Sequence, residues 1–375
     1  MKIGITCYPT VGGSGVIATE LGKMLAEDGN EIHFISSSLP FRLDKFYPNI
    51  FYHEVDVGHY PVFQYPPYDL ALATKMADVI DEKELDVLHV HYAVPHAICA
   101  ILAKDIAERD VKIVTTLHGT DITVLGVDNT FKKMIKYGIE KSDAVTAVSK
   151  SLVNQTKEMI DTNKDISIIY NFVNEEEYMP KQNPTLKQKY GIAAEEKVMI
   201  HISNFRRVKR VDEIVHTFRK VKEQVNSKLL LVGDGPEYSS TVQLVKNLGL
   251  DNDVLFLGKQ NNISDLLSIS DLMLLLSEKE SFGLVLLEAM ACMVPCIGTD
   301  VGGIPEVIKH EETGYTVELG NTELAAKYAI QLLEDTEKLE EFSRNAFNHT
   351  QRYFKSSEIV KQYMNLYKHI LISKQ

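Results

Sequence analysis

Several features that mark other protein classes are missing from this sequence of 375 residues. No apolar run approaches the roughly 18 residues that a transmembrane helix needs. Positive charge is in deficit, because 40 Lys and Arg stand against 52 Asp and Glu, a formal net charge of −12. The sequence therefore predicts no membrane span. It also disfavours binding to nucleic acid or to an anionic membrane surface, since both need a basic footprint.

Cysteine is also scarce. The four cysteines lie in apolar surroundings at positions 7, 99, 292 and 296, and the last two are too far apart for a C-x-x-C motif. Cysteines in such surroundings are typically reduced and buried in the core. The opening residues, MKIGITCYP, read as a strand and not as a signal peptide. We therefore expect a cytoplasmic protein.

The sequence does contain a regular alternation of strand-like and helical segments. Eleven strand-like runs, mostly apolar on both faces, read KIGITC, EIHFIS, DVLHVHY, KIVTTLHG, DAVTAVS, ISIIYN, KVMIHIS, KLLLVG, DVLFLG, DLMLLLS and PCIGT. Such runs separated by helical patterns are typical of parallel sheets that are covered by helices. The predicted fold class is α/β, with two Rossmann-like, doubly wound domains.

The domain boundary is expected in NFVNEEEYMPKQNP, an acidic stretch with two prolines. This gives a first domain over 1–170 and a second over 171–355, and the final helix, at about 356–375, is expected to pack back on the first domain. Ligands of doubly wound sheets bind beyond the carboxyl ends of the strands. We therefore expect the functional residues at these ends, facing an interdomain cleft.

A glycine-rich loop with Gly12, Gly13 and Gly15 is expected between the first strand and its helix. Such a loop lets backbone N–H groups approach a phosphate. The segment GSGVIA also fits the dinucleotide pattern G-x-G-x-x-A. However, the second strand ends in IHFISSSLP, without the acidic residue that would hold a ribose. This disfavours a dinucleotide, while phosphate binding and a turn without a ligand both stay open.

Two neighbouring strand ends carry polar side chains. Tyr92 ends DVLHVHY, and His118 and Thr120 follow KIVTTL. A single histidine is more often a core residue than a catalytic one, and we assign His89 and His91, inside a strand, to the core. Both roles stay open for His118, which stands at a strand tip beside a glycine.

The second domain opens with a basic loop. Arg206, Arg207, Lys209 and Arg210 follow the strand KVMIHIS. A run of charge is usually a solvated surface, but cations at a strand end could neutralise a diphosphate.

Two turns are further candidate sites. Gly233, in VGDGPE, stands at a strand end, where a bare turn is the simple alternative to ligand binding. Asp251 and Asp253 form a D-x-D pair, but it lies between a helix and a strand, at the end of the sheet opposite to the expected site. We predict a turn for this pair, and no metal.

The segment ESFGLVLLE is apolar except for its acidic ends. Glu280 and Ser281 follow a strand, and the amides of Gly283 and Leu284 begin a helix, where they lack intrahelical partners. A phosphate there would gain from both the donors and the helix dipole. Glu288 lies inside an apolar helix, where a carboxylate needs a partner, and the hydroxyls of a sugar could serve.

Together these motifs resemble the retaining glycosyltransferases of the two-domain GT-B fold. ESFGLVLLEAMA is similar to their E-x7-E motif, and GGSG, HGTD, the basic loop, VGDGPE and VGGIPEVI extend the resemblance over nearly the whole chain. CYPTVGGSGVIATELG, FQYPPYDLALA, HVHYAVPHA and TTLHGTDITVLG resemble the members that act in bacillithiol biosynthesis. Those members transfer N-acetylglucosamine from UDP-N-acetylglucosamine to L-malate. The resemblance implies a metal-independent enzyme without a cofactor.

The resemblance also implies a role for each matching residue. The catalytic residues would be His118, Arg206, Lys209 and Glu280. The donor would be bound by Gly12, Gly13, Gly15, Gly233, Ser281, Phe282, Gly283, Leu284 and Glu288, and the acceptor by Tyr92 and Thr120. Many relatives have Gly-Arg where Ser203 and Asn204 stand, so the diphosphate arginine is expected two positions later, at Arg206.

Three competing functions stay open: a glycosyltransferase with another acceptor, a UDP-sugar epimerase, and a nucleotide-binding protein without catalysis. The net charge and the expected lack of a basic amphipathic helix argue against a lipid acceptor. Candidate cations for the malate carboxylates are Arg42, Lys132 and Lys133, but the sequence does not select among them. The oligomeric state, including a homo-oligomer, is also open.

Overall fold

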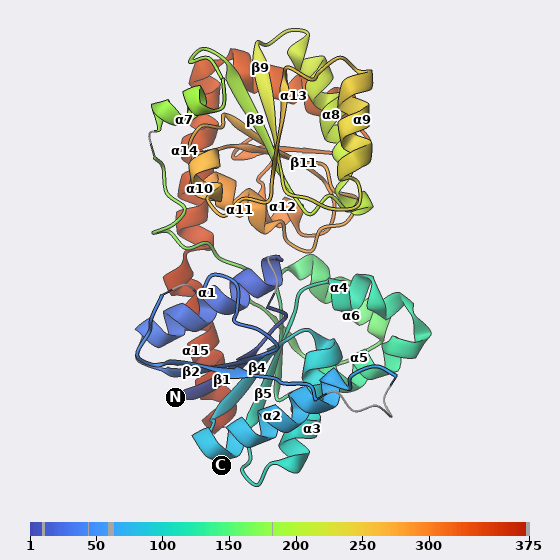
Figure 1. The fold of residues 1–375 in the computed structure, drawn as a ribbon, viewed down its shortest axis with the longest axis vertical. Coiled ribbons are helices and arrows are strands. Elements are labelled where there is room, and N and C mark those ends of the chain that lie inside the picture. Colours follow the sequence, from blue (N-terminus) through green and yellow to red (C-terminus); the bar gives the residue numbers. More distant parts are fainter. Residues whose placement is uncertain (10–11, 44, 59–63, 182, 373–375) are drawn as a thin grey trace. The chain divides into compact units, whose positions relative to one another are not determined.

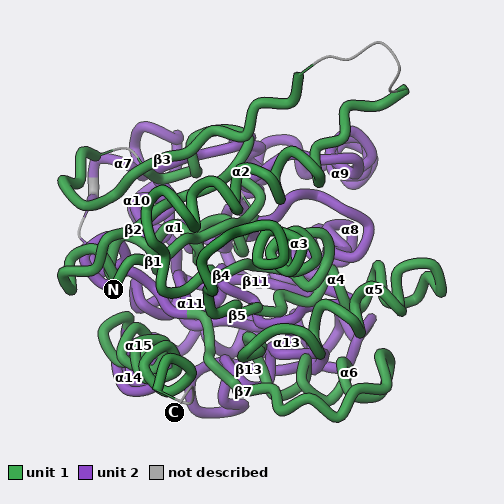
Figure 2. The backbone as a smooth tube through the Cα atoms, turned by 90° about the horizontal axis from the view of Figure 1, so that it is seen from below, with its two compact units in different colours: residues 1–171, 356–375 green, residues 172–355 purple. Residues whose placement is uncertain are grey.

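The computed structural model describes residues 1–9, 12–43, 45–58, 64–181 and 183–372. The chain forms two compact units, which Figure 2 distinguishes by colour. Unit 1 contains Met1–Asn171 together with Ser356–Gln375, and unit 2 contains Phe172–Lys355. Unit 1 is therefore built from both ends of the chain, whereas unit 2 is one continuous segment.

Unit 1 is built on a parallel seven-stranded sheet with the order β3-β2-β1-β4-β5-β6-β7. The central strands are buried along almost their whole length, as parallel strands covered on both faces should be. Their bounds are β1 Lys2–Thr6, β2 Glu31–Ser36, β3 Ile50–Glu54, β4 Val87–His91, β5 Lys112–Leu117, β6 Ala144–Ala147 and β7 Ile166–Ile168.

Helices cover both faces of this sheet (Figure 1). Helices α1 and α15 pack together on one face, while α2, α3 and α5 form a second layer. The α-helix bounds are α1 Gly13–Glu27, α2 Tyr68–Lys83, α3 Ile98–Ile106, α4 Thr120–Thr123, α5 Asn129–Lys141, α6 Lys150–Ile160 and α15 Ser356–Ile372. Short helical segments also lie at η1 Ala93–Ala97 and η2 Leu125–Val127.

Helix α15 ends the chain but packs inside unit 1. Its Tyr363 and Tyr367 are buried, and the Tyr367 hydroxyl lies 2.7 Å from Nδ1 of His89 on β4. Nε2 of His89 lies 2.7 Å from the Thr116 hydroxyl on β5. His89 is therefore a core residue with partners at both ring nitrogens, as predicted.

Unit 2 has a parallel six-stranded sheet with the order β10-β9-β8-β11-β12-β13. The strands are β8 Lys197–Ile202, β9 Ser227–Val232, β10 Val254–Gly258, β11 Leu272–Leu275, β12 Cys296–Thr299 and β13 Gly314–Val317. With its seven-stranded counterpart, this sheet confirms the predicted class of two parallel-sheet α/β domains, the GT-B fold.

The sheet of unit 2 is also covered on two faces (Figure 1). Helices α8, α9 and α13 form one layer, and α10, α11 and α14 form another. The bounds are α7 Pro184–Lys189, η3 Arg207–Lys209, α8 Val211–Lys222, α9 Tyr238–Asn247, α10 Ile263–Leu267, α11 Leu284–Ala291, α12 Ile304–Val307, α13 Thr322–Glu334 and α14 Thr336–Tyr353.

The structure corrects three sequence predictions. Two strands were missed: β3 lies at a sheet edge and is not apolar on both faces, and β13, with the sequence GYTV, contains no continuous apolar run. The glycine-rich segment is not all loop, because α1 begins at Gly13 and includes the buried Gly15. The sequence also predicts no basic amphipathic helix. However, α5 is rich in lysine and carries Phe131, Met134 and Tyr137 on its surface.

Two further observations concern membranes and the D-x-D pair. None of the helices in the described ranges is long and apolar enough to cross a bilayer. Asp251 and Asp253 lie in a turn, as predicted, and the Asp253 carboxylate pairs with Lys222 at 3.0 Å and Lys228 at 2.9 Å.

Candidate functional site

In unit 2 the basic loop follows the carboxyl end of β8. Its conformation is fixed by Phe205, which is fully buried and adopts a left-handed φ of 42°. This anchor lets the next side chains leave the core, and Arg206 and Arg207 are exposed. Lys209 ends the short helix η3 and is only partly exposed.

The cations of this loop are not equivalent. The Lys209 ammonium pairs with the Glu280 carboxylate at 2.5 Å, with side-chain exposures of 19% and 17%. Arg210 pairs with Glu213 and lies 4.0 Å from Glu278. Arg210 is therefore engaged within the protein, and the Lys209 charge is directed at the loop that holds the first acid of the E-x7-E motif.

The loop after β11 is fixed by backbone contacts on two sides. The Glu278 amide donates to the Val208 carbonyl at 2.8 Å, which ties this loop to the basic loop. On the other side, the Gly303 amide donates to the Glu280 carbonyl at 3.0 Å. A side chain at Gly302 would place its Cβ 1.8 Å from that carbonyl oxygen. The VGGIPEVI glycines thus allow the close approach that holds Glu280 in place.

Helix α11 begins immediately after this loop. Its N-cap is Gly283, with φ of 89° and no side-chain cap, so the first amides of the helix have no intrahelical acceptor. Ser281 is partly exposed, whereas the Phe282 ring is buried and packs edge-on against Phe354 at 5.7 Å. Phe282 therefore anchors the turn, and the Gly283 and Leu284 amides stand at the end of the helix where its dipole favours negative charge.

Glu288 lies in the last half of α11. It is 6% exposed in a helix whose other residues from Leu286 to Ala291 are apolar and buried. Burial, and to a smaller extent this carboxylate, raises the pKa of the Cys292 thiol to about 12. The sequence argument that Glu288 stands in an apolar environment therefore agrees with its position.

Gly233 has a packing reason for being glycine. It follows β9 with φ of 121°, and a Cβ there would lie 1.8 Å from the Ser203 carbonyl oxygen. Gly235 meets the Asn204 carbonyl in the same way, at 1.9 Å. The VGDGPE turn is thus pressed against the start of the basic loop, a contact that explains both glycines without a ligand.

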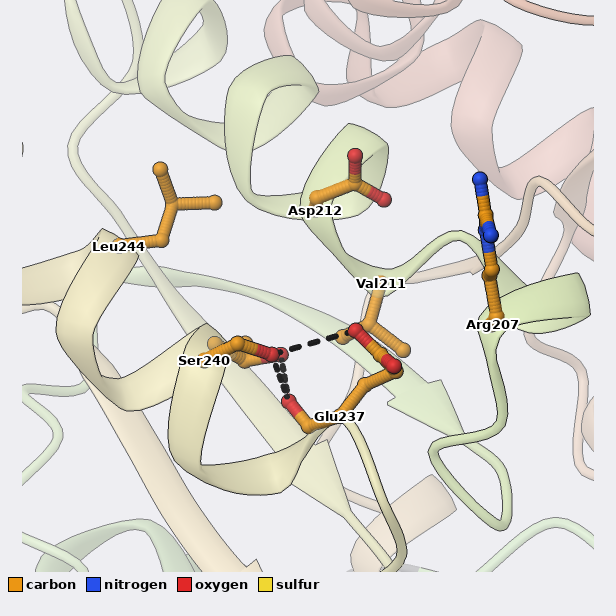
Figure 3. Close-up of a pocket in the computed structure, with 7 residues that line it drawn as sticks. Arg207, Val211, Asp212, Glu237, Ser240 and Leu244 are labelled. Atoms are coloured by element: carbon orange, nitrogen blue, oxygen red, sulfur yellow. Dashed lines mark hydrogen bonds between the residues drawn. The ribbon is translucent and has the colours of Figure 1, made fainter.

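A cavity of about 410 Å³ borders Arg207 of the basic loop and lies between the first turn of α8 and the first part of α9 (Figure 3). Arg207 borders it, together with the acidic side chains of Asp212 and Glu237. Ser240 bonds the Glu237 carbonyl and carboxylate at 2.9 and 3.2 Å. None of the residues predicted to bind the donor lines this cavity, which places Arg207 in a different environment from Lys209.

In unit 1 the glycine-rich segment is connected to the end of β4. Gly12 is the N-cap of α1 and, like Gly13, is exposed. Between the glycines, the Ser14 hydroxyl lies 2.5 Å from the Tyr92 hydroxyl. The structure therefore brings the tip of Tyr92 to the beginning of α1, a pairing that the sequence did not indicate.

His118, Tyr92 and Thr120 gather at the carboxyl ends of β4 and β5. The rings of Tyr92 and His118 lie 5.3 Å apart, and Nε2 of His118 is 2.8 Å from Nδ1 of the buried His91. Burial, with a smaller contribution from His96, lowers the pKa of His118 to about 3. His118 is therefore neutral near pH 7 and can bind a ligand by hydrogen bonding, while Thr120 is exposed at the start of α4.

A metal ion at the candidate site would need a group of side chains that could hold it. No group of three or more His, Cys, Asp or Glu side chains that could hold a metal ion occurs among the residues that the structure describes. A lysine, an exposed arginine and uncapped helix amides can stabilise a departing oxyanion directly.

Comparison with known proteins defines the class. The family model "Glycosyl transferases group 1" matches residues 182–349, and "Glycosyltransferase Family 4" matches residues 11–177. A Bacillus anthracis protein named N-acetyl-alpha-D-glucosaminyl L-malate synthase is 61% identical over 371 residues, which cover 99% of this chain and 97% of that protein. The chain belongs to this family of GT-B glycosyltransferases.

Solved structures show the same fold at lower identity. A Rickettsia africae glycosyltransferase has a TM-score of 0.84 with 24% identity, and the match covers 99% of this chain and 98% of that one. Anabaena HepE, solved with UDP and glucose, has a TM-score of 0.83 with 22% identity and full coverage of both chains.

Proposed function

We propose that this glycosyltransferase moves N-acetylglucosamine from UDP-N-acetylglucosamine to L-malate with retention at the anomeric carbon, the first step of bacillithiol biosynthesis. The observation that carries the proposal is the 61% identity, over nearly the full length of both chains, to a protein named for this reaction. The four cysteines are free and buried, which supports our assignment to the reducing cytoplasm.

The donor is assigned to unit 2. Lys209 and Arg206 would bind the diphosphate together with the amides of Gly283 and Leu284, which begin α11. Glu280 would accept hydrogen bonds from the hydroxyls of the transferred sugar, and Glu288 from those of the ribose. In the structure Lys209 and Glu280 pair with each other, so donor binding exchanges this ion pair for contacts with phosphate and sugar.

The acceptor is assigned to unit 1, at the ends of β4 and β5. Tyr92 and Thr120 would contact malate, and His118 would bond the donor sugar near its 6-hydroxyl. The exposed glycines before and in the first turn of α1 would approach the phosphates through their amides. Gly233 would bind the donor through its backbone alone, because its φ and packing leave no room for a side chain.

The chemical step requires no nucleophile from the protein. The bond between the anomeric carbon and the diphosphate oxygen breaks, and negative charge grows on the departing UDP. Cations and helix amides stabilise that charge. The malate hydroxyl attacks the same face, and its proton passes to the leaving diphosphate oxygen. The products are the α-glycoside of malate and UDP.

The test is mass spectrometry of products from UDP-N-acetylglucosamine with a panel of acceptors. The panel contains L-malate, D-malate, succinate, simple sugars and lipid acceptors. Lipids belong in it because the amphipathic α5 removes one sequence argument against them. We expect one N-acetylhexosamine added to L-malate and no product with succinate, which lacks the hydroxyl. Product from a sugar or lipid but not from malate would contradict the proposal.

The same assay distinguishes a transferase from an epimerase and from a protein that only binds nucleotides. An epimerase would convert the donor to a sugar isomer when no acceptor is present. A nucleotide-binding protein without catalysis would bind UDP but release none from the donor in the presence of malate. Either result, obtained with no malate glycoside, would replace the proposed function.

A further inference from the structure

Asp121 is a buried carboxylate at the centre of the unit 1 site. It is 0% exposed and lies in the first turn of α4, directly after the exposed Thr120. Its carboxylate has no cation partner within the described part of the chain. A buried carboxylate without a cation is costly unless hydrogen bonds satisfy it. The bonds that Asp121 accepts therefore indicate what this residue does.

The carboxylate of Asp121 connects the ends of two strands. Oδ2 accepts from the Ala93 amide at 3.0 Å, and Oδ1 accepts from the Gly119 amide at 3.0 Å. Ala93 directly follows Tyr92, and Gly119 directly follows His118. One carboxylate thus fixes the spacing between the two backbone segments that carry the predicted ligand-binding side chains.

The segment of Tyr92 needs such a constraint because its backbone conformation is unusual. Tyr92 has φ of 85° and ψ of 135°, a region that side-chain-bearing residues rarely adopt. Gly119 has φ of 110°, which glycine adopts readily. A strained backbone persists when the surroundings over-determine it, and the Asp121 bonds hold the peptide group next to each residue.

The same two side chains are held at their tips by other residues. The Tyr92 hydroxyl bonds the Ser14 hydroxyl at 2.5 Å, and the His118 ring bonds the His91 ring at 2.8 Å. Asp121 fixes the bases of these side chains, so each one is held at two points. This is the arrangement that a preorganised binding site requires.

We propose that Asp121 is a positioning residue of the acceptor site, which sets the distance and orientation between Tyr92 and His118 through the amides of Ala93 and Gly119. The proposal rests on the proposed function, because it assigns these side chains to the acceptor and the transferred sugar. Asp121 itself is expected to touch neither substrate, since its carboxylate is buried.

The chain offers a matched control at the other end of β5. Asp143 is also a carboxylate that bonds a backbone amide of this strand, at Ile113, with a distance of 2.9 Å. It pairs with Lys112 at 2.8 Å and Lys104 at 3.4 Å. Asp143→Asn weakens a comparable hydrogen bond between a carboxylate and a backbone amide. It leaves the carboxyl ends of β4 and β5 unchanged.

The experiment compares Asp121→Asn with Asp143→Asn in the full chain. Asparagine has nearly the same shape, but one of its terminal groups cannot accept a hydrogen bond, so one backbone amide loses its partner. For Asp121→Asn we expect the KM for malate to rise by at least tenfold and the affinity for UDP, measured by calorimetry, to stay within twofold. For Asp143→Asn both quantities should stay within twofold, whatever happens to the melting temperature.

NMR spectra of the isotope-labelled protein give a second measurement, which does not depend on malate being the acceptor. The side-chain signals of Tyr92 and His118 should shift in Asp121→Asn and stay in place in Asp143→Asn. If wild type makes no malate glycoside, the proposed function fails, and these signals still decide the role of Asp121. Unchanged signals together with an unchanged KM would overturn the positioning role.

Loss of folding also has a defined meaning. Asp121→Ser is a second variant that keeps one accepting oxygen. If both variants at Asp121 fail to fold by circular dichroism while Asp143→Asn folds, Asp121 serves stability alone and the proposal is overturned. Equal losses of malate and UDP binding in a folded variant would overturn it as well.

Discussion

The strand ends of unit 1 and unit 2 are built from different chemistry. In unit 2 the candidate site contains an ion pair, between Lys209 and Glu280, and the uncapped amides that begin α11. In unit 1 the side chains predicted to meet ligands are uncharged, with His118 bonded to His91 and Tyr92 bonded to Ser14, and the carboxylate beside them, Asp121, is fully buried. The comparison indicates that the two units handle different parts of the reaction, since a departing diphosphate needs charge and a sugar or an acceptor hydroxyl needs oriented hydrogen bonds.

The largest predicted effect tests the charged side of this comparison. Lys209→Ala should lower kcat by roughly 10²–10³, by analogy with removing one oxyanion-stabilising donor. Steady-state kinetics with saturating substrates measures this. Arg207→Ala is the control, because Arg207 is a cation of the same loop that borders the separate cavity (Figure 3). Equal losses from both substitutions would mean that the loop acts only through its net charge.

The next effect concerns binding more than turnover. Glu288→Gln should weaken UDP binding by about tenfold to a hundredfold, the value of hydrogen bonds to a charged group. Isothermal titration calorimetry measures it. Glu306→Gln, in the short helix α12 of the same unit, is a matched loss of one negative charge and should leave the affinity for UDP within twofold. A Glu288 variant with wild-type affinity would remove this residue from the ribose site.

The next prediction concerns unit 1, whose buried neutral histidine His89 makes its stability depend on pH. Burial lowers the pKa of His89 to about 3, against about 6.5 in an unfolded chain. Between these two values the unfolded state binds the proton and the folded state does not. Stability is therefore lost as pH falls from 6.5, by up to about 1.4 kcal/mol per pH unit for this group. Thermal unfolding from pH 7 to pH 4 should show a shallower decline for His89→Gln than for wild type.

The smallest effect is expected at the contact between α1 and β4. Ser14→Ala removes the partner of the Tyr92 hydroxyl, and the KM for malate should rise by about twofold to tenfold, the worth of one neutral hydrogen bond. Initial rates at varied malate measure it. Thr74→Ala is the control, since that hydroxyl lies on the exposed side of α2 and bonds the Leu70 carbonyl. An unchanged KM for malate in the Ser14 variant would mean that the glycine-rich segment does not contribute to acceptor binding.

The sequence was sufficient for the fold class because parallel strands buried on both faces leave unambiguous apolar runs. β3 was missed because an edge strand with exposed Phe51 carries no such run. The residues of the candidate site were selected by strand-end position and by motif. Their mutual contacts could not be predicted, since pairs such as Ser14 with Tyr92 or Lys209 with Glu280 join segments about 70–80 positions apart, which only the tertiary fold brings together.

Packing explains the glycines of two motifs, VGDGPE and VGGIPEVI, which the sequence alone relates to ligand binding or to a family resemblance. Gly233 and Gly302 each stand where a Cβ would collide with a backbone carbonyl, so packing by itself is a sufficient reason for glycine at both positions. The aspartate of HGTD received no role from the sequence, because its partners are backbone amides that no pattern of side chains could reveal.

Helix α15 has a consequence for how the molecule is made. Residues 172–355 emerge from the ribosome as one uninterrupted block and can reach their final structure during synthesis. Unit 1 must wait, because Tyr367, the partner of His89, is translated only after the whole of unit 2. A chain released after Lys355 should therefore carry a folded unit 2 beside an incomplete, protease-sensitive unit 1.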